Sequence, residues 1–256
     1  MDTGGSLIQR RVDEMRALFN AVRKQLIFLA GDIRREHCPL GFAWGKYERL
    51  IDHDEMAQAV GRSYPGYIGL HRNRGDLSNV AIGGFMKHAW IVDIKNTTRI
   101  VEAVSDGVMY RHPYHPLNTD YAVILKPLVP EEARHEACRR AREMVGCPYD
   151  DTFTFDLEIV SDLFQDKETA LSNMKRYGLG VSCTEMVALC YVGHRRELGL
   201  YRTKLGKRQV ILPDAFLSTH FEIVWASWHT KPDTAHMLGL HEEGCSMLRE
   251  YWEKRR

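Results

Sequence analysis

The chain has 256 residues, of which 44% are hydrophobic and 27% are charged, as in an ordinary globular protein. Lys and Arg number 35 against 34 Asp and Glu, so the net charge does not favour nucleic acid or an anionic membrane as the principal partner. The six cysteines form neither a CxxC pair nor a dense framework, which argues against a structural zinc site and a disulfide-stapled module. We therefore expect reduced thiols and neither a metal nor a cofactor.

The sequence shows no signal peptide and no transmembrane segment. Its first strongly apolar run, residues 26–30, begins late, is short and follows many charged residues. No stretch approaches the roughly 20 apolar residues that a membrane-spanning helix needs. These features predict a cytoplasmic protein without an integral membrane segment.

Residues 1–62 are predicted to form a helical N-terminal extension. Apolar residues recur every three or four positions through residues 6–36, which predicts a long amphipathic helix broken near Gly31. A shorter helix is expected over residues 47–60, and the acidic cluster at residues 52–55 is interpreted as a solvated turn, not a metal site. The apolar stripe of the first helix needs a partner, either the main domain or another protein, including a second copy of this chain.

Residues 63–230 carry the strand patterns of the predicted main domain. The clearest hairpin joins residues 88–94 to residues 99–104. Its symmetry places His88 and Glu102 roughly opposite one another, close enough to interact if they share a face of the sheet. A carboxylate beside an imidazole orients the ring and stabilises its charged form.

The other elements follow from the same patterns of periodicity and turn residues. An unbroken apolar run at residues 121–125 predicts a central strand, and a helix should begin at Pro130 and stop at Gly146. The remaining expectations are a strand at 67–71, a loop at 105–120, a polar insertion at 161–177, strands at 209–213 and 221–225, and one amphipathic helix in a C-terminal tail, 231–256.

A cysteine stands at the start of a predicted helix. Gly180 leads into Ser182, the expected N-cap, and Glu185 three residues later is its capping-box partner. Cys183 then falls in the first turn, where a helix N-terminus can lower a thiol pKa to about 3.5–7.5. The sequence thus predicts a nucleophilic sulfur, the plainer alternative being a small buried residue, as free cysteines usually are.

A helix-start thiol, a strand histidine and a facing carboxylate are the parts of a cysteine hydrolase. Cys183 would attack a carbonyl, His88 would take and return the proton, and Glu102 would hold the imidazole. These residues, with Gly146-Cys147-Pro148-Tyr149 ahead of the cysteine, resemble the papain-like amidases of the NlpC/P60 superfamily. His88 and Glu102 precede Cys183, as in its circularly permuted branch. The Tyr-Asp pair and the Cys-x-Glu helix start are most similar to the YiiX-like (poxvirus G6-like) group.

The resemblance covers roughly residues 63–228 and implies a circularly permuted papain-like α+β fold, an antiparallel sheet packed against helices. It implies a hydrolase of amide bonds, either peptide or isopeptide bonds of cell-wall type or lipid-linked amides. It also implies that Tyr149 donates a hydrogen bond to the substrate or the oxyanion, with the backbone N–H of Cys183 as the other donor. The alternative, given equal weight, is that Tyr149 only packs in the interior and has no role in catalysis.

Two other functions remain open. In the retinol-acyltransferase-like branch the acyl group passes to an alcohol or amine, but that branch shows an Asn-Cys start and a membrane-anchoring tail, where this chain has Ser182-Cys183 and a charged end. A non-catalytic binding or structural module is the third alternative, and the presence of all three triad residues argues against it.

The remaining histidines and cysteines near these motifs are interpreted more simply. His71, His112 and His115 are expected at the surface. Cys147 is the one rival thiol that could lie near the cleft because it precedes Tyr149 closely, and Cys190 is expected in the core on the buried face of its helix.

Overall fold

The computed structural model describes residues 33–35, 42–44, 48–74, 84–93, 99–150, 180–200, 203–205 and 208–255. The expected insertion at 161–177 and most of the expected helix at 6–36 lie outside these residues. The chain divides into two units, one made of Met1–Lys46 with Gly75–Ala81 and the other of the remaining residues. In the first unit β1 (Ile33–Arg35) pairs antiparallel with β2 (Phe42–Trp44), so Ile33–Arg35 is a strand and not the end of a helix.

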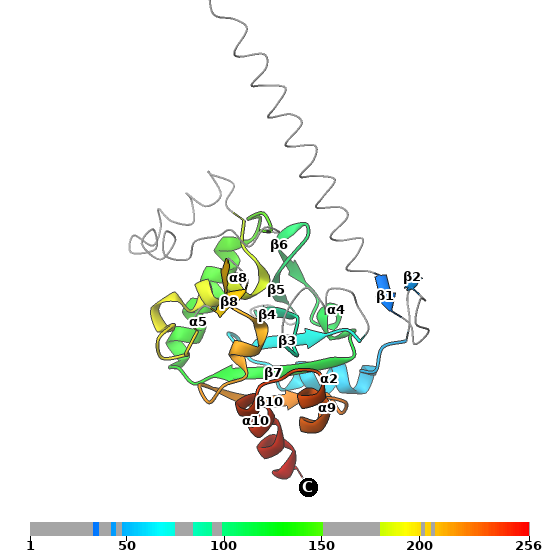
Figure 1. The fold of residues 1–256 in the computed structure, drawn as a ribbon. Helices are drawn as coiled ribbons and strands as arrows, with labels where there is room; N and C mark the ends of the chain where they lie inside the picture. The colour runs from blue at the N-terminus through cyan, green and yellow to red at the C-terminus, as the bar shows by residue number, and fades with distance from the viewer. Residues whose placement is uncertain are drawn as a thin grey trace, which may run out of the picture. The chain divides into compact units, whose positions relative to one another are not determined.

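The second unit is built on a six-stranded antiparallel sheet in the order β10-β7-β3-β4-β5-β6 (Figure 1). A separate two-stranded ladder pairs β8 with β9. The strands are β3 (Ile68–Arg72), β4 (His88–Val92), β5 (Ile100–Val104), β6 (Gly107–Arg111), β7 (Tyr121–Pro127), β8 (Thr203–Leu205), β9 (Arg208–Val210) and β10 (Phe221–Ala226).

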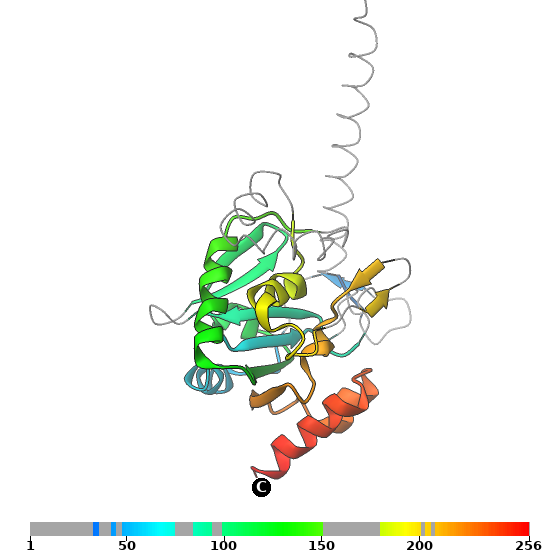
Figure 2. The same cartoon turned by 90° about the vertical axis from the view of Figure 1, so that its left-hand side faces the viewer.

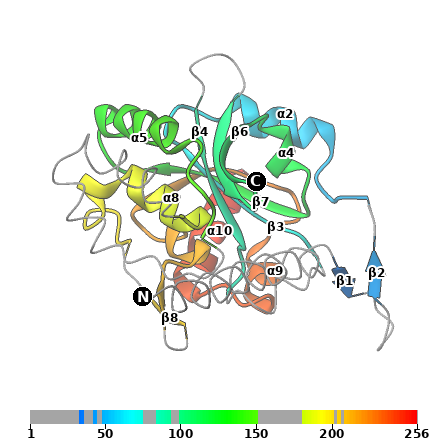
Figure 3. The same ribbon diagram turned by 90° about the horizontal axis from the view of Figure 1, so that it is seen from above.

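Helices pack on both faces of the sheet, which makes this an α+β structure. They are α2 (His53–Gly61), α4 (Tyr114–Leu117), α5 (Glu131–Met144), α8 (Cys183–Cys190), α9 (Pro232–Met237) and α10 (Glu242–Glu253), with 3-10 turns η1 (Val192–His194) and η2 (Pro213–Phe216). Helices α5 and α8 lie next to each other over one face of the sheet (Figure 2). Seen from above, α2 and α4 lie on the other side (Figure 3).

Strand side chains alternate between the two layers, as the period of a β-strand requires. Ala89 and Ile91 of β4 belong to the core beneath α5 and α8, whereas Trp90 and Val92 belong to the core beneath α2 and α4. The Trp90 ring lies over Gly69 of β3, where an added Cβ would come within 2.0 Å of the indole. Only glycine at position 69 leaves room for this tryptophan.

Most of the expected elements of this unit are present. The strand at 67–71, the hairpin of β4 and β5, the interior strand β7, the helix α5 that ends before Gly146, the helix α8 and the strand β10 are all confirmed. The shorter helix expected over 47–60 is α2, and Asp52, within its expected acidic turn, is the N-cap.

Three expectations for the second unit were wrong. Residues 105–120 are not a loop, because Gly107 with φ of 105° closes a tight turn that returns β6 along β5 and α4 follows. The C-terminal tail holds two helices, α9 and α10, separated at Gly239 with φ of 97°. The strand expected at 209–213 ends at Val210, since Pro213 opens a 3-10 turn.

Candidate active site

Helix α8 begins at Cys183, as the sequence predicts, and its first turn is capped reciprocally. Ser182 Oγ accepts a hydrogen bond from Glu185 N at 3.4 Å, and the Glu185 carboxylate accepts from Ser182 N at 3.0 Å. The Ser182 hydroxyl also donates to Glu185 Oε2 at 2.7 Å. Both residues are 1% exposed. The capping box is therefore confirmed, and it fixes the helix end that carries the thiol.

His88 opens β4, and the segment before it is clamped to η2. The Asp214 carboxylate accepts hydrogen bonds from the backbone N–H groups of Phe85 and Met86, at 2.5 and 2.6 Å. Gly84 has φ of 85°, and a Cβ there would lie 2.3 Å from Asp214 Oδ2. The clamp therefore needs a glycine at 84 and sets the position at which His88 enters the sheet.

His88 and Glu102 are in contact, as expected, but they are not directly opposite. Glu102 pairs with Trp90, two residues along β4 from His88. A shift of two residues keeps both side chains on the same face of the sheet. Nε2 of His88 consequently lies 3.0 Å from Oε2 of Glu102, whose side chain is 2% exposed.

The Cys183 thiol meets His88 from the other layer. The side chains of Glu102 and His88 lie on the same face of the sheet as Trp90. Helix α8 covers the opposite face. The two sides meet because α8 starts beside the beginning of β4. There Cys183 is hydrogen-bonded to His88 and to the backbone of Ala89. The structure thus brings the three predicted triad residues together.

The electrostatics of this group favour a charged pair. Burial alone would raise the pKa of the Cys183 thiol, but the positive charge and hydrogen bond of His88 and backbone N–H groups lower it below its ordinary value. Burial alone would likewise lower the pKa of His88, yet its contacts with Cys183 and Glu102 raise it. A thiolate facing an imidazolium is the protonation state that both shifts favour.

The Glu102 carboxylate contacts more than one basic side chain. Its Oε1 atom lies 3.4 Å from Nδ1 of His115 on α4 and 3.6 Å from Nε of Arg111 on β6. Burial would raise the pKa of this carboxyl, but contacts with His115 and His88 hold it well below its usual range. His115 is expected at the surface from the sequence. Its side chain is indeed 57% exposed, but it contacts the buried carboxylate because the expected loop is a strand and a helix.

His71 was expected at the surface, but it is partly buried and its ring packs against His88. It pairs directly with His88 across β3 and β4, and the two ring centroids are 4.8 Å apart at an interplanar angle of 43°. The signal was present in the sequence, since His71 ends one predicted strand and His88 begins the next. Antiparallel pairing of consecutive strands places such residues side by side.

Tyr149 lies in a segment that runs beside the approach to Cys183. Tyr149 forms an isolated parallel bridge with Val181, and Asp150 N donates to Val181 O at 3.2 Å. A Cβ at Gly180 would approach Asp150 N to 2.7 Å, so glycine is required for this close passage. The Tyr149 side chain is partly buried against the core beneath α8, and its backbone partner is two residues before Cys183.

Cys183 differs from the other cysteines of the described residues. It is 6% exposed, whereas the fully buried Cys147 and Cys190 are 0% exposed. Burial raises the pKa of Cys138 to about 12, and it also raises the pKa values of Cys190 and Cys245. The expectation that Cys190 is a core residue is confirmed. The surroundings of Cys183, in contrast to those of Cys138, Cys190 and Cys245, favour the thiolate.

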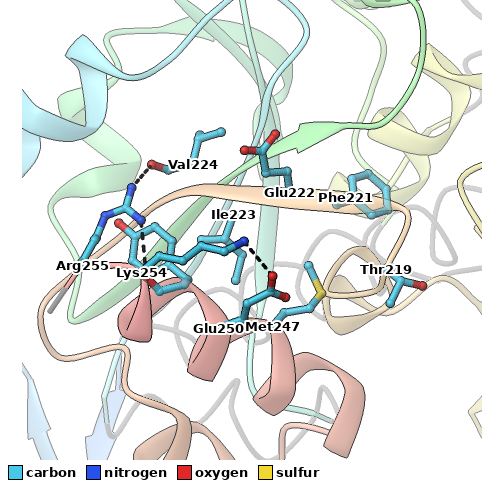
Figure 4. Close-up of a pocket in the computed structure, with 10 residues that line it drawn as sticks. Thr219, Phe221, Glu222, Ile223, Val224, Met247, Glu250, Lys254 and Arg255 are labelled. Atoms are coloured by element: carbon cyan, nitrogen blue, oxygen red, sulfur yellow. Dashed lines mark hydrogen bonds and ion pairs between the residues drawn. The ribbon is translucent and has the colours of Figure 1, made fainter.

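A groove elsewhere in the second unit is lined by different residues. It lies between β10 and α10, has a volume of about 410 Å³ and is flanked by the ion pair of Lys254 with Glu250 (Figure 4). Arg255 crosses it to donate to Val224 O at 3.3 Å. None of the triad residues lines this groove.

The fold and the site together define an α+β protein with a Cys-His-Glu arrangement at the end of an antiparallel sheet. No protein-family model, curated protein or solved structure matches the chain. Within the described parts of the chain, none of the helices has the length and apolar character needed to cross a membrane.

Proposed function

We propose that this protein is a cysteine-dependent hydrolase of amide bonds on a circularly permuted papain-like fold. One observation carries the proposal: Cys183 at the N-terminus of α8 is hydrogen-bonded to His88, which in turn contacts the buried Glu102 at 3.0 Å. A nucleophile, a base within reach and a third group that orients the base are the parts of covalent acyl-transfer catalysis.

In the proposed reaction the Cys183 thiolate attacks the carbonyl carbon of an amide. The C=O electron pair moves to oxygen, then returns and expels the amine, which takes a proton from His88. This leaves an acyl-Cys183 thioester and a neutral imidazole. His88 then removes a proton from water as the water attacks the thioester, the carboxylic acid is released and the thiolate–imidazolium pair is restored.

Glu102 is proposed to orient the imidazole and to stabilise its charge. Its Oε2 contacts Nε2 of His88, which leaves Nδ1 for the thiol. We also propose the backbone N–H of Cys183 and the hydroxyl of Tyr149 as the two donors to the oxyanion. The passage of the Tyr149 segment along Val181 supports this role for Tyr149.

The proposed substrates are those that the family resemblance suggests: peptide or isopeptide amides, or lipid-linked amides. Hydrolysis and acyl transfer share the acyl-Cys183 intermediate and differ in the acceptor. A nucleophilic amine added to the reaction would be incorporated into the product by a transferase, whereas a hydrolase gives mainly the free acid.

The test is the pH dependence of alkylation by iodoacetamide, measured for each cysteine-containing peptide by mass spectrometry. We expect Cys183 to react well below about pH 8.5, the ordinary thiol pKa, and to lose this behaviour in His88→Ala. Cys190→Ala is the matched control on the same helix and should leave the Cys183 profile unchanged. A Cys183 that titrates as an ordinary thiol in the unmodified protein would contradict the proposal.

A further inference from the structure

A second histidine, His71, lies beside His88 and has no role in the mechanism proposed above. His71 on β3 is directly paired with His88 on β4, and its ring packs against the His88 ring at 4.8 Å. Glu102 contacts His88 from the other neighbouring strand, β5. The His88 imidazole is therefore held between a ring on one side and a carboxylate on the other.

His71 makes this contact as a neutral ring. Its Nδ1 atom is buried and has no hydrogen-bond partner among the described residues. The titratable and charged groups around it are His88 on β4, Glu102 on β5, His115 on α4 and Arg49 before α2. Burial, followed by the charge of His88, lowers the pKa of His71 to about 3, so the ring stays uncharged at neutral pH.

A neutral ring at this position suits an imidazolium neighbour. A second positive charge there would repel the charge of His88 and lower its pKa, which would weaken the thiolate pair. An uncharged aromatic ring instead fills the space beside His88 and restricts rotation of its imidazole. With Nε2 directed to Glu102, the restricted ring keeps Nδ1 available to Cys183.

We propose that His71 is a positioning residue, whose neutral ring packs against His88 and holds the imidazole in the plane that serves both Glu102 and Cys183. This inference rests on the proposed function and deepens it. His71 itself neither accepts nor donates a proton in the reaction, and its packed ring is the feature that matters.

The test compares variants that remove the ring with one that retains it, in the full-length protein. His71→Leu and His71→Gln remove the ring while keeping a side chain of similar size. His71→Phe keeps a neutral aromatic ring without the nitrogens. His135→Ala changes an exposed histidine on α5 and is the control. Cys183 alkylation by iodoacetamide is followed from pH 4 to pH 9, and the midpoint for thermal unfolding is measured in parallel.

We expect the ring-removing variants to raise the alkylation midpoint of Cys183 by roughly one pH unit, and His71→Phe to keep the original midpoint. A lowered thermal midpoint with an unchanged alkylation profile in the Leu and Gln variants would show a purely structural role and overturn the inference. A shift in His71→Phe as large as in His71→Leu would overturn it too, because the ring alone would not suffice.

Failure of this inference is distinguishable from failure of the proposed function. If Cys183 of the unmodified protein titrates as an ordinary thiol, the proposed function fails whatever the His71 variants do. If Cys183 of the unmodified protein reacts at low pH and the His71→Leu profile matches it, the role of His71 alone is refuted.

Discussion

Nε2 of His88 lies 3.0 Å from Oε2 of Glu102 across two neighbouring strands, although the residue directly opposite Glu102 is Trp90. A carboxylate that is 98% buried is costly unless cations and hydrogen bonds compensate it. His88 provides such compensation and is itself held in place by it. The contact therefore links the burial of Glu102 to the protonation state of the candidate nucleophile.

Replacement of Glu102 by Gln should weaken the charged pair. Gln keeps the size of the side chain and removes the negative charge, so the pKa of His88 should fall and that of the Cys183 thiol should rise by roughly one unit. The measurement is the rate of Cys183 alkylation at pH 6. Glu222→Gln, at a 55% exposed carboxylate of β10, is the matched control and should leave this rate unchanged. An unaltered rate in Glu102→Gln would show that the contact does not support the thiolate.

The same carboxyl should affect the pH dependence of stability. Its pKa in the folded protein lies below the ordinary value of 4.5, so its stabilising contribution is present above pH 4.5 and is lost as the pH falls through the lowered value. The difference in the free energy of unfolding between wild type and Glu102→Gln should therefore be constant from pH 5 to pH 6 and shrink below about pH 4.5. Urea unfolding at each pH measures it, and a difference that grows in acid would contradict the sign.

Two helix caps provide a comparison within the chain. Ser182→Ala should cost about 2 kcal/mol of unfolding free energy, since it removes a cap and a donor to the buried Glu185. Asp52→Ala removes the exposed cap of α2, where Asp52 Oδ1 accepts from Glu55 N at 2.8 Å, and should cost about 1 kcal/mol. Only Ser182→Ala should also slow the alkylation of Cys183. Equal alkylation rates in both variants would show that the Ser182 cap does not affect the reactivity of Cys183.

Substitutions at two glycines should show how tightly the Tyr149 segment packs against the residues before Cys183. A Cβ at Gly180 would lie within 2.9 Å of the backbone of Tyr149 and Asp150, so Gly180→Ala should lose about 1–3 kcal/mol of stability and displace the Tyr149 segment. A Cβ at Gly193 in η1 would meet nothing within 4 Å, so Gly193→Ala should be neutral or slightly stabilising. Urea unfolding at pH 7 distinguishes the two. Equal stability of both variants would show that the Tyr149 segment can move to accommodate a Cβ at position 180 at little cost in free energy.

The sequence predicted the local features of the site well. Hydrogen-bonding and periodicity rules that act within a few residues are enough to place Ser182, Cys183 and Glu185 in a capped first turn, and the structure has that turn. Two β-rich runs separated by a short polar segment were likewise enough to predict the hairpin of β4 and β5. The insertion expected at 161–177, and the helix expected at 6–36 apart from Ile33–Arg35, lie outside the described residues and remain predictions.

Features that depend on strand register and on contacts between layers were not predictable from the sequence. A hairpin midpoint does not fix register to better than a residue or two, so the diagonal placement of Glu102 had to come from the folded sheet. The sequence pattern predicts a loop around Gly107, so it does not reveal the contacts of Arg111 and His115 with Glu102.

By itself, then, the sequence determined which residue types begin α8, β4 and the strand that follows, because these are properties of short segments. The tertiary structure decided that α8 starts beside the beginning of β4, so that Cys183 from one layer meets His88 from the other. It also decided that the His71 ring packs against His88 and is uncharged. The physical reason is that proximity between layers and the desolvation of a side chain arise only from packing, which no local pattern encodes.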